Sequence, residues 1–144
     1  MLATITFRAL GISARRILDA ALYDHMNNGG AENGNLAMTY LQLDKWGVTQ
    51  ADIRKGLAEL YATGFLRQTT QGKFTLAGKI PSRYALTWLP TGVWPSGEPP
   101  THDWAKIIER LSKQGVGSVA AAKLWLKGEV AEHMRGNPAA RNRT

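Results

Sequence analysis

Residues 39–57 read TYLQLDKWGVTQADIRKGL, and this stretch decides the fold. Its pattern predicts two short helices joined by a tight turn around Gly47 and Val48. We expect Thr39 to be the N-cap of the first helix and Thr49 the N-cap of the second, because threonine hydroxyls accept hydrogen bonds from free N–H groups. Gly47 ends the first helix, since glycine adopts the positive φ that a helix exit often requires. The first helix would then brace the second, whose outer face would protrude.

The segments before this stretch predict one further helix and a short strand. Ser13 precedes an apolar pattern of helical period, so we expect a helix over residues 14–26 with Ser13 as its N-cap. Residues 27–35 are rich in glycine and asparagine and predict a loop, and residues 36–38 predict a minimal strand. Residues 1–12 are mildly apolar, and we expect a short strand or a loose N-terminal arm.

After Gly64 the apolar pattern changes from helical to alternating. Residues 65–70 and 83–89 predict two strands, and the glycine- and proline-containing segment between them predicts a hairpin with a long tip. We expect one face of the second strand to be buried and the other exposed. The two sets are Tyr84, Leu86 and Trp88 against Arg83, Ala85 and Thr87. Trp46 and Trp88 both fit core positions.

The remainder of the chain predicts an appendage to this domain. Residues 91–102 form a proline-rich linker, residues 103–135 contain two helices, and residues 136–144 form a basic tail. The last helix carries an apolar stripe made of Val119, Ala122, Leu126, Val130 and Met134. With an N-terminal arm over 1–12 and the main domain over 13–90, the predicted fold class is α+β and mainly helical.

The predicted order is helix, short strand, helix, tight turn, helix and hairpin, which resembles a winged helix-turn-helix domain. The resemblance is to small winged-helix proteins of bacterial mobile elements, and it covers residues 14–90. It rests on ENGNLAMTYLQLDKWGV, LAELYATGFL and PSRYALTWLP. Leu43 stands where a small alanine is usual, and Gly56 stands where an apolar side chain is usual. The resemblance implies a bacterial DNA-binding protein that acts in transcription regulation or in plasmid or phage replication.

The helix over residues 49–63 is expected to lie in the major groove of double-stranded DNA. Its inner face carries Ile53, Leu57 and Leu60, and the opposite face carries small and polar residues. Alanine permits close approach to base edges, arginine pairs with guanine, and glutamine pairs with adenine. The candidate contacts on this helix are Thr49, Gln50, Ala51, Arg54, Lys55 and Ala58.

The hairpin over residues 65–89, the wing, is expected to contact the DNA backbone or the minor groove. Residues 60–97 contain no acidic residue, although several basic residues fall there. A surface of one charge sign with polar residues interleaved suits phosphate contacts. The candidates in the wing are Arg67, Thr69, Gln71, Lys73, Lys79 and Arg83. Further candidates for backbone contacts are Arg15, Arg16 and Thr39.

Composition supports a polyanionic partner and excludes several classes of site. The 144 residues carry a formal net charge of +7 and have a pI of about 10.0. The chain has no cysteine, which excludes disulfides and thiolate zinc sites. No apolar run approaches the ~18 residues that span a bilayer, so we expect a cytoplasmic protein. The histidines and carboxylates lack the spacing of a metal or catalytic site, and we expect no enzyme, metal or cofactor.

Two alternatives remain open at this point. The domain could instead be a winged-helix interaction module whose basic surface meets an acidic protein partner. DNA is favoured if Gln50, Arg54 and Lys55 lie exposed on one face together with the basic residues of the hairpin. The stripe on the last helix either forms a homodimer through the C-terminal helices or packs inside the chain against the helix over 14–26.

Overall fold

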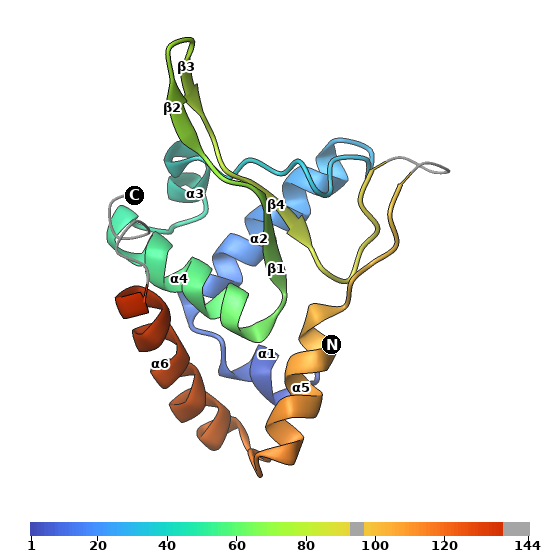
Figure 1. Ribbon diagram of the computed structural model, residues 1–144, viewed down its shortest axis with the longest axis vertical. Helices are drawn as coiled ribbons and strands as arrows, with labels where there is room; N and C mark the ends of the chain where they lie inside the picture. The colour runs from blue at the N-terminus through green and yellow to red at the C-terminus, as the bar shows by residue number, and fades with distance from the viewer. Residues whose placement is uncertain (93–96, 137–144) are drawn as a thin grey trace.

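The computed structural model describes residues 1–92 and 97–136, and its α+β architecture confirms the predicted fold class (Figure 1). Helices form the body of the molecule, and a long hairpin extends from one end in a winged-helix-like arrangement. In chain order the elements are α1 (Ile5–Ala9), α2 (Ile12–Asn27), α3 (Tyr40–Lys45), α4 (Gln50–Thr63), β1 (Leu66–Thr70), β2 (Lys73–Thr75), β3 (Gly78–Ile80), β4 (Arg83–Leu86), α5 (Asp103–Lys113) and α6 (Val119–Gly136).

The predicted pair of short helices is present as α3 and α4. The Thr39 hydroxyl accepts a hydrogen bond from the Gln42 backbone N–H at 3.2 Å, and the Gln42 side chain accepts one from the Thr39 N–H at 3.0 Å. This reciprocal capping box fixes the start of α3. Gly47 has a φ of +80°, and Val48 fills the corner between the helices at 1% exposure.

Gly56 sets the distance between α2 and α4. A Cβ atom at this position would lie 2.6 Å from Cδ1 of Ile17 and 3.3 Å from the backbone nitrogen of Ala14. Glycine therefore allows an approach that a side chain would prevent. Ile17 and Ile53 are buried beside this contact. The residue that departs from the usual helix-turn-helix pattern thus brings α4 close to α2.

The hairpin consists of two paired segments in succession. β1 and β4 pair antiparallel at its base with one register shift, and β2 and β3 pair antiparallel toward its tip. The strand predicted over residues 36–38 is reduced to a single bridge between Leu36 and Tyr84. The alternation expected for the second strand is wrong, since Ala85 is 0% exposed and Thr87 is 1% exposed. Both faces of β4 are covered by the rest of the chain.

The N-terminal segment contains a packed helix, not a strand or a loose arm. Thr4 caps α1 with its hydroxyl, and Thr6 within α1 is 0% exposed. α1 packs against α6, which belongs to the far end of the chain. α2 begins directly after its N-cap Gly11, so Ser13 lies inside the first turn. The prediction that Ser13 is the N-cap is therefore wrong.

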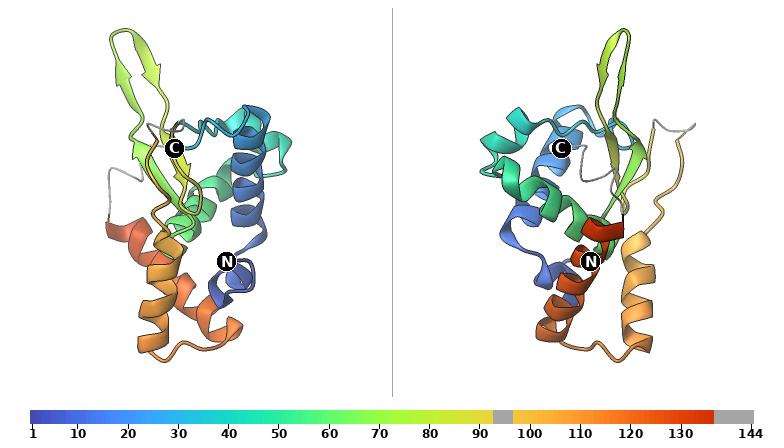
Figure 2. Two further views of the ribbon diagram at one scale, coloured as in Figure 1. Left: turned by 90° about the vertical axis from the view of Figure 1, so that its right-hand side faces the viewer. Right: turned by 60° about the vertical axis from the view of Figure 1, so that its left-hand side comes forward.

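The C-terminal helices complete the core at the end of the molecule opposite the hairpin (Figures 1 and 2). α6 packs against both α1 and α4. In the predicted stripe, Ala122 is 1% exposed, Leu126 is 2% exposed, and the other members are half-buried. The stripe thus packs inside the chain, although against α1 and α4 and not against α2. A homodimer would need a surface other than this stripe.

Trp46 is not a core residue as predicted, although Trp88 does pack against the core. Trp46 is the C-cap of α3 and is 37% exposed. Its ring lies on the Tyr23 ring of α2, with 5.6 Å between the centroids. The smaller Val48 fills the corner between α3 and α4 instead, so the indole is left at the surface.

Asn33 fastens the loop between α2 and α3 to the end of β4. Its side chain is 3% exposed, and Oδ1 accepts a hydrogen bond from the N–H of Leu86 at 2.6 Å. Nδ2 lies within hydrogen-bond distance of the carbonyls of Leu86, Leu89 and Pro90, at 2.9, 3.0 and 3.1 Å. The Asn33 amide therefore makes hydrogen bonds with backbone groups that a neighbouring strand would otherwise make. The sequence predicts only a loop here, because every partner of Asn33 lies far along the chain.

Candidate nucleic-acid interface

The first two turns of α4 form an exposed, mainly polar surface. The exposed residues predicted for DNA contact are Thr49, Gln50, Ala51 and Lys55. Arg54 is half-buried. Asp52 is also exposed and accepts a hydrogen bond from the Thr49 hydroxyl at 2.8 Å, so this hydroxyl does not cap a backbone N–H of α4. The helix therefore presents the predicted residues at its start, with one carboxylate among them.

The second half of α4 is enclosed. Ala58 is 1% exposed and Glu59 is 8% exposed, because α2 and α6 both pack along α4. The prediction that Ala58 contacts bases is therefore wrong. The helical period correctly placed Ala58 opposite the Ile53 face, but a second helix covers that side. The exposed surface of the helix is limited to residues 49–55.

The tip hairpin, which is β2 and β3 with the turn that joins them, extends beyond the helical body (Figure 1). Lys73 and Lys79 are exposed on it. The Lys79 ammonium lies 5.9 Å from the ring centroid of Phe74 and 5.9 Å from that of Tyr40, the first residue of α3. The contact with Tyr40 connects the tip hairpin to α3, and the contact with Phe74 lies within the hairpin.

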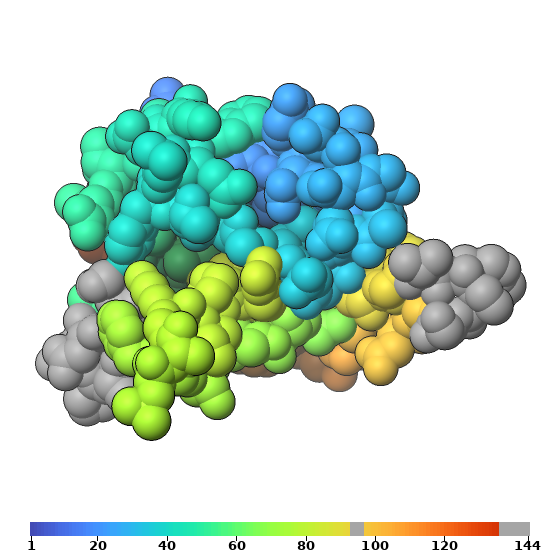
Figure 3. Space-filling view, turned by 90° about the horizontal axis from the view of Figure 1, so that it is seen from above, coloured from blue at the N-terminus to red at the C-terminus, as the bar shows by residue number. Residues whose placement is uncertain are grey.

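The start of α4 and the tip hairpin are presented at the same end of the molecule. Seen from above, α3, the start of α4 and the tip hairpin are all visible, and a hollow separates the hairpin from the helices (Figure 3). The hairpin side of this hollow contributes positive charge and no negative charge, since residues 60–97 contain no acidic residue. The arrangement can therefore receive an anionic polymer between a helix end and a basic ribbon.

Other predicted wing residues are engaged in holding the base of the hairpin. The Thr69 hydroxyl donates to the Gly34 carbonyl at 2.6 Å, and the Arg83 guanidinium donates to the Asn35 carbonyl at 3.3 Å. Both bonds attach the loop before α3 to β1 and β4. Gln71 is exposed between β1 and β2. Phosphate contact by these three residues stays a prediction.

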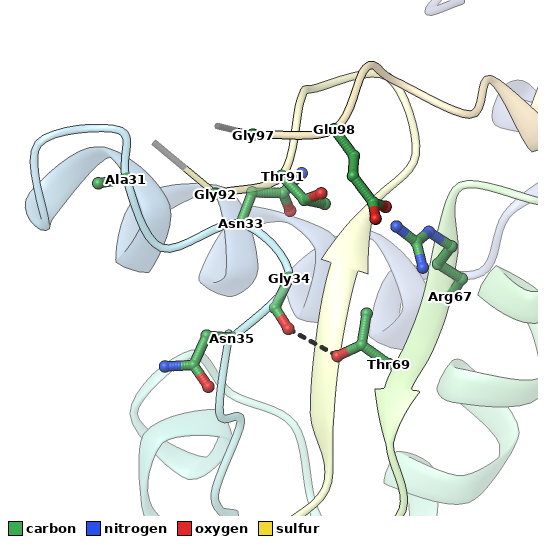
Figure 4. Close-up of a pocket in the computed structure, with 10 residues that line it drawn as sticks. All are labelled: Ala31, Asn33, Gly34, Asn35, Arg67, Thr69, Thr91, Gly92, Gly97 and Glu98. Carbon is green, nitrogen blue, oxygen red and sulfur yellow. Dashed lines mark hydrogen bonds between the residues drawn. The ribbon is translucent and has the colours of Figure 1, made fainter. Parts of the chain in front are cut away.

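Arg67 lies in a separate groove at the base of the hairpin (Figure 4). The groove has a volume of about 450 Å³ and is lined by the loop over 31–35, by β1 and by Thr91 and Glu98. The Arg67 guanidinium is directed toward the Glu98 carboxylate, and its Nε atom is buried without a hydrogen-bond partner among the described residues. Because Arg67 belongs to β1 at the base of the hairpin, it is not part of the surface at the hairpin tip.

The three further candidates for backbone contacts have structural roles. The Arg15 guanidinium donates to the Phe7 carbonyl at 3.3 Å and lies over the Phe7 ring, 5.5 Å from its centroid, so it fastens α1 to α2. Arg16 donates to the Gly47 carbonyl at 2.9 Å and braces the turn between α3 and α4. The Thr39 hydroxyl caps α3. We therefore do not include these residues in the interface.

Glu59, on the enclosed half of α4, is a buried carboxylate that faces the start of α2. Glu59 Oε1 accepts a hydrogen bond at 3.3 Å from the N–H of Gly11, the N-cap of α2. Burial raises the pKa of Glu59 above its ordinary value of 4.5, while the Gly11 hydrogen bond and the charge of Lys55 act in the opposite direction. Glu59 thus links α4 to α2 at the cost of a desolvated carboxylate.

Because the pKa of Glu59 is higher in the folded state, the free energy of unfolding should fall as pH rises above 4.5. Between the unfolded-state and folded-state pKa values, the folded chain holds more bound protons than the unfolded chain. Above the folded-state pKa both states are deprotonated, so the fall should stop. The Glu59→Gln variant still offers an oxygen to the Gly11 N–H but cannot ionise, so its curve should lack this fall. Urea unfolding of both proteins from pH 4.5 upward measures the difference.

The exposed carboxyl of Asp19 on α2 supplies the control for this prediction. The Asp19→Asn variant should keep the fall in the unfolding free energy, since its carboxyl is not buried. Parallel curves for the wild type and Glu59→Gln would mean that the Glu59 proton is not linked to folding.

Within the described ranges, no group of histidine, aspartate and glutamate side chains is arranged to hold a metal ion. None of the described helices has the length and apolar character needed to cross a membrane. Comparison of the chain with family models, curated proteins and solved structures gave no match. The function is therefore inferred from the residues and their geometry alone.

Proposed function

We propose that this chain binds double-stranded DNA, with the start of α4 in the major groove and the tip hairpin on the backbone or in the minor groove. The observation that carries the proposal is an exposed helix start and an exposed basic hairpin at one end of the molecule (Figures 1 and 3). A helix-turn-helix of this kind lets the first turns of its second helix protrude into a groove. Such a protein would act as a transcription regulator or a replication accessory factor.

The exposed side chains supply both kinds of contact that a duplex requires. Lys55, Lys73 and Lys79 carry the positive charge for phosphates, whose neutralisation releases counterions and drives binding. Gln50 offers an amide that pairs with adenine, and the Ala51 methyl group suits contact with thymine. Since Ala58 is buried, base contacts are confined to the first two turns of α4, and one domain would read a short site.

Replacing Lys55, Lys73 and Lys79 together with alanine should weaken duplex binding at least about tenfold at moderate salt, because three phosphate contacts are lost. All three side chains are exposed, so the helical body should stay folded, while Lys79→Ala also removes the contacts of this side chain with the Tyr40 and Phe74 rings. Fluorescence anisotropy with a labelled duplex of random sequence measures the affinity, and circular dichroism checks the fold.

The matched control removes the same charge from the opposite end of the molecule. Lys106 on α5 and Lys123 and Lys127 on α6 are exposed, and both helices lie away from the hairpin (Figure 1). Their combined replacement with alanine should change the affinity far less. Equal losses in the two triple variants would mean that only net charge matters, and that α4 and the hairpin do not form the interface.

Exposed apolar side chains, two of them aromatic, favour a second candidate, an acidic protein partner whose own apolar residues would cover them while its carboxylates meet the basic surface. Tyr23 is 57% exposed, Met26 is 66% exposed and Trp46 is 37% exposed, on α2 and at the end of α3. If an acidic protein is the partner, polyglutamate should bind about as tightly as duplex DNA, and the triple alanine variant at Lys55, Lys73 and Lys79 should lose this binding, because carboxylates pair with cations. If DNA is the partner, polyglutamate should bind weakly, and Tyr23→Ala and Trp46→Ala should bind duplex as the wild type does.

A further inference from the structure

We propose that the tip hairpin inserts an apolar wedge, Leu76, between adjacent base pairs from the minor groove and thereby bends the duplex. This inference rests on the proposed DNA binding and adds a deformation that major-groove contact by α4 does not require. Proteins that bend DNA from the minor groove insert apolar side chains between base steps while basic side chains contact the neighbouring phosphates.

The apex of the tip hairpin is apolar and uncovered. Leu76 and Ala77 form a two-residue turn between Thr75 and Gly78, which are paired in the ladder. Leu76 is 111% exposed and Phe74 is 84% exposed, so no other described part of the chain covers them. Hairpin turns of this length usually carry asparagine, aspartate or glycine. A leucine at the apex contributes no packing to the fold, so its apolar surface is available to a partner outside the chain.

Lysines flank this apex in the register of the ladder. Lys79 lies opposite Phe74, and Lys73 lies opposite Ile80. Each apolar side chain below the turn therefore has a cation across from it, and residues 60–97 supply no acidic side chain to oppose them. A groove of DNA has the complementary pattern, in which apolar base faces lie between two rows of phosphates.

The tip hairpin is also supported at its base. The Gly72 N–H donates to the Ser82 hydroxyl oxygen at 2.9 Å, which closes the two strands just below the ladder. Lys79 over the Tyr40 ring, at 5.9 Å, holds the hairpin against α3. Unstacking a base step costs free energy, so a wedge must be held firmly by the rest of the protein to remain inserted.

A lipid surface and a second copy of the chain fit the tip less well. Burial of one leucine or phenylalanine contributes too little free energy to hold the chain at a membrane, since even a whole myristoyl chain binds membranes only marginally. The start of α4, presented at the same end, is mainly polar (Figure 3). Pairing of two tip hairpins would bring Lys73 and Lys79 of both copies together, and their like charges would repel.

Ligase-mediated circularisation of a duplex of about 120 base pairs tests the wedge, because this length lies below the persistence length of about 150 base pairs. The full chain should accelerate circularisation, and Leu76→Ser should reduce that acceleration at least about tenfold, since unstacking costs more than the 1.4 kcal/mol of one factor of ten. Leu76→Met keeps the apolar volume and should keep the bending. Leu124→Ser, at a leucine on α6 that is 75% exposed, is the matched control and should change nothing.

Anisotropy with a short duplex separates bending from binding. Leu76→Ser should bind within about threefold of the wild type, because the lysines that contact phosphates remain. A wild type that binds duplex without bending it, or a Leu76→Ser variant that bends it equally, would overturn the wedge and leave DNA binding in place. A wild type that does not bind duplex would overturn both. Phosphatidylserine vesicle binding or a dimer in sedimentation, if either is lost in Leu76→Ser, would assign the tip to that partner instead.

Discussion

Replacing Gly64 with alanine should lower the free energy of unfolding by about 2–5 kcal/mol, the sum of backbone strain and a clash. Gly64 ends α4 with a φ of +76°, a conformation that costs an L-residue roughly 1–2 kcal/mol. A Cβ atom there would lie 2.7 Å from the carbonyl carbon of Asp103 and 2.7 Å from the nitrogen of Trp104. These are backbone atoms at the start of α5 and cannot rotate away, so overpacking adds about 1–3 kcal/mol. Urea unfolding monitored by tryptophan fluorescence measures the loss.

Two other glycines separate the contributions to this loss. Gly115 has a φ of +79° but nothing within 4 Å of its Cβ position, so Gly115→Ala should cost only the strain, about 1–2 kcal/mol. Gly128 lies within α6 with open space around it, and Gly128→Ala should stabilise the chain by about 0.8–1.0 kcal/mol. If Gly64→Ala costs no more than Gly115→Ala, α5 does not pack on the end of α4 as the structure shows.

Replacing Leu126 with alanine should lower the free energy of unfolding by about 2–5 kcal/mol, because it leaves a cavity in the core. Leu126 is 2% exposed on α6, in the stripe that packs against α1 and α4. Leu124→Ala removes the same atoms from the same helix at a position that is 75% exposed, and it should cost less than about 0.5 kcal/mol.

The same pair of variants distinguishes core packing from a homodimer. If the stripe packs inside the chain, the unfolding midpoint of the wild type should not depend on protein concentration. If the stripe instead formed a dimer, the midpoint would rise with concentration, and Leu126→Ala would remove that dependence. This second result would contradict the placement of α6 in the core.

The two short helices α3 and α4 and the turn between them could be predicted because their determinants act over a few residues. The reciprocal bonds between Thr39 and Gln42 span one turn, and the positive φ of Gly47 belongs to one residue. The charge of the hairpin was equally accessible, since a run without acidic residues gives its strands a single charge sign regardless of register. These local signals placed the start of α4 and the lysines of the tip hairpin correctly at the surface.

The remaining features depend on contacts between distant segments. Ala58 lies on the face that the helical period marks as outer, and it is buried because other helices, α2 and α6, pack along α4. In the sequence Arg15 has no evident partner, because the carbonyl to which it donates belongs to Phe7 of α1. α1 itself is five residues long, which is too short for a periodic pattern. The exposure of Leu76 could not be predicted, because the sequence does not distinguish an apolar residue at an exposed hairpin tip from one that packs in the core.

The most direct test of the proposed interface is the salt dependence of duplex binding by the full chain. If Lys55, Lys73 and Lys79 each neutralise one phosphate, the logarithm of the binding constant should fall against the logarithm of salt with a slope of about −2.7, from about −0.9 per phosphate. The triple alanine variant at these positions should lose most of this slope. A flat response of the wild type, or a triple variant that keeps the full slope, would contradict DNA binding through α4 and the hairpin.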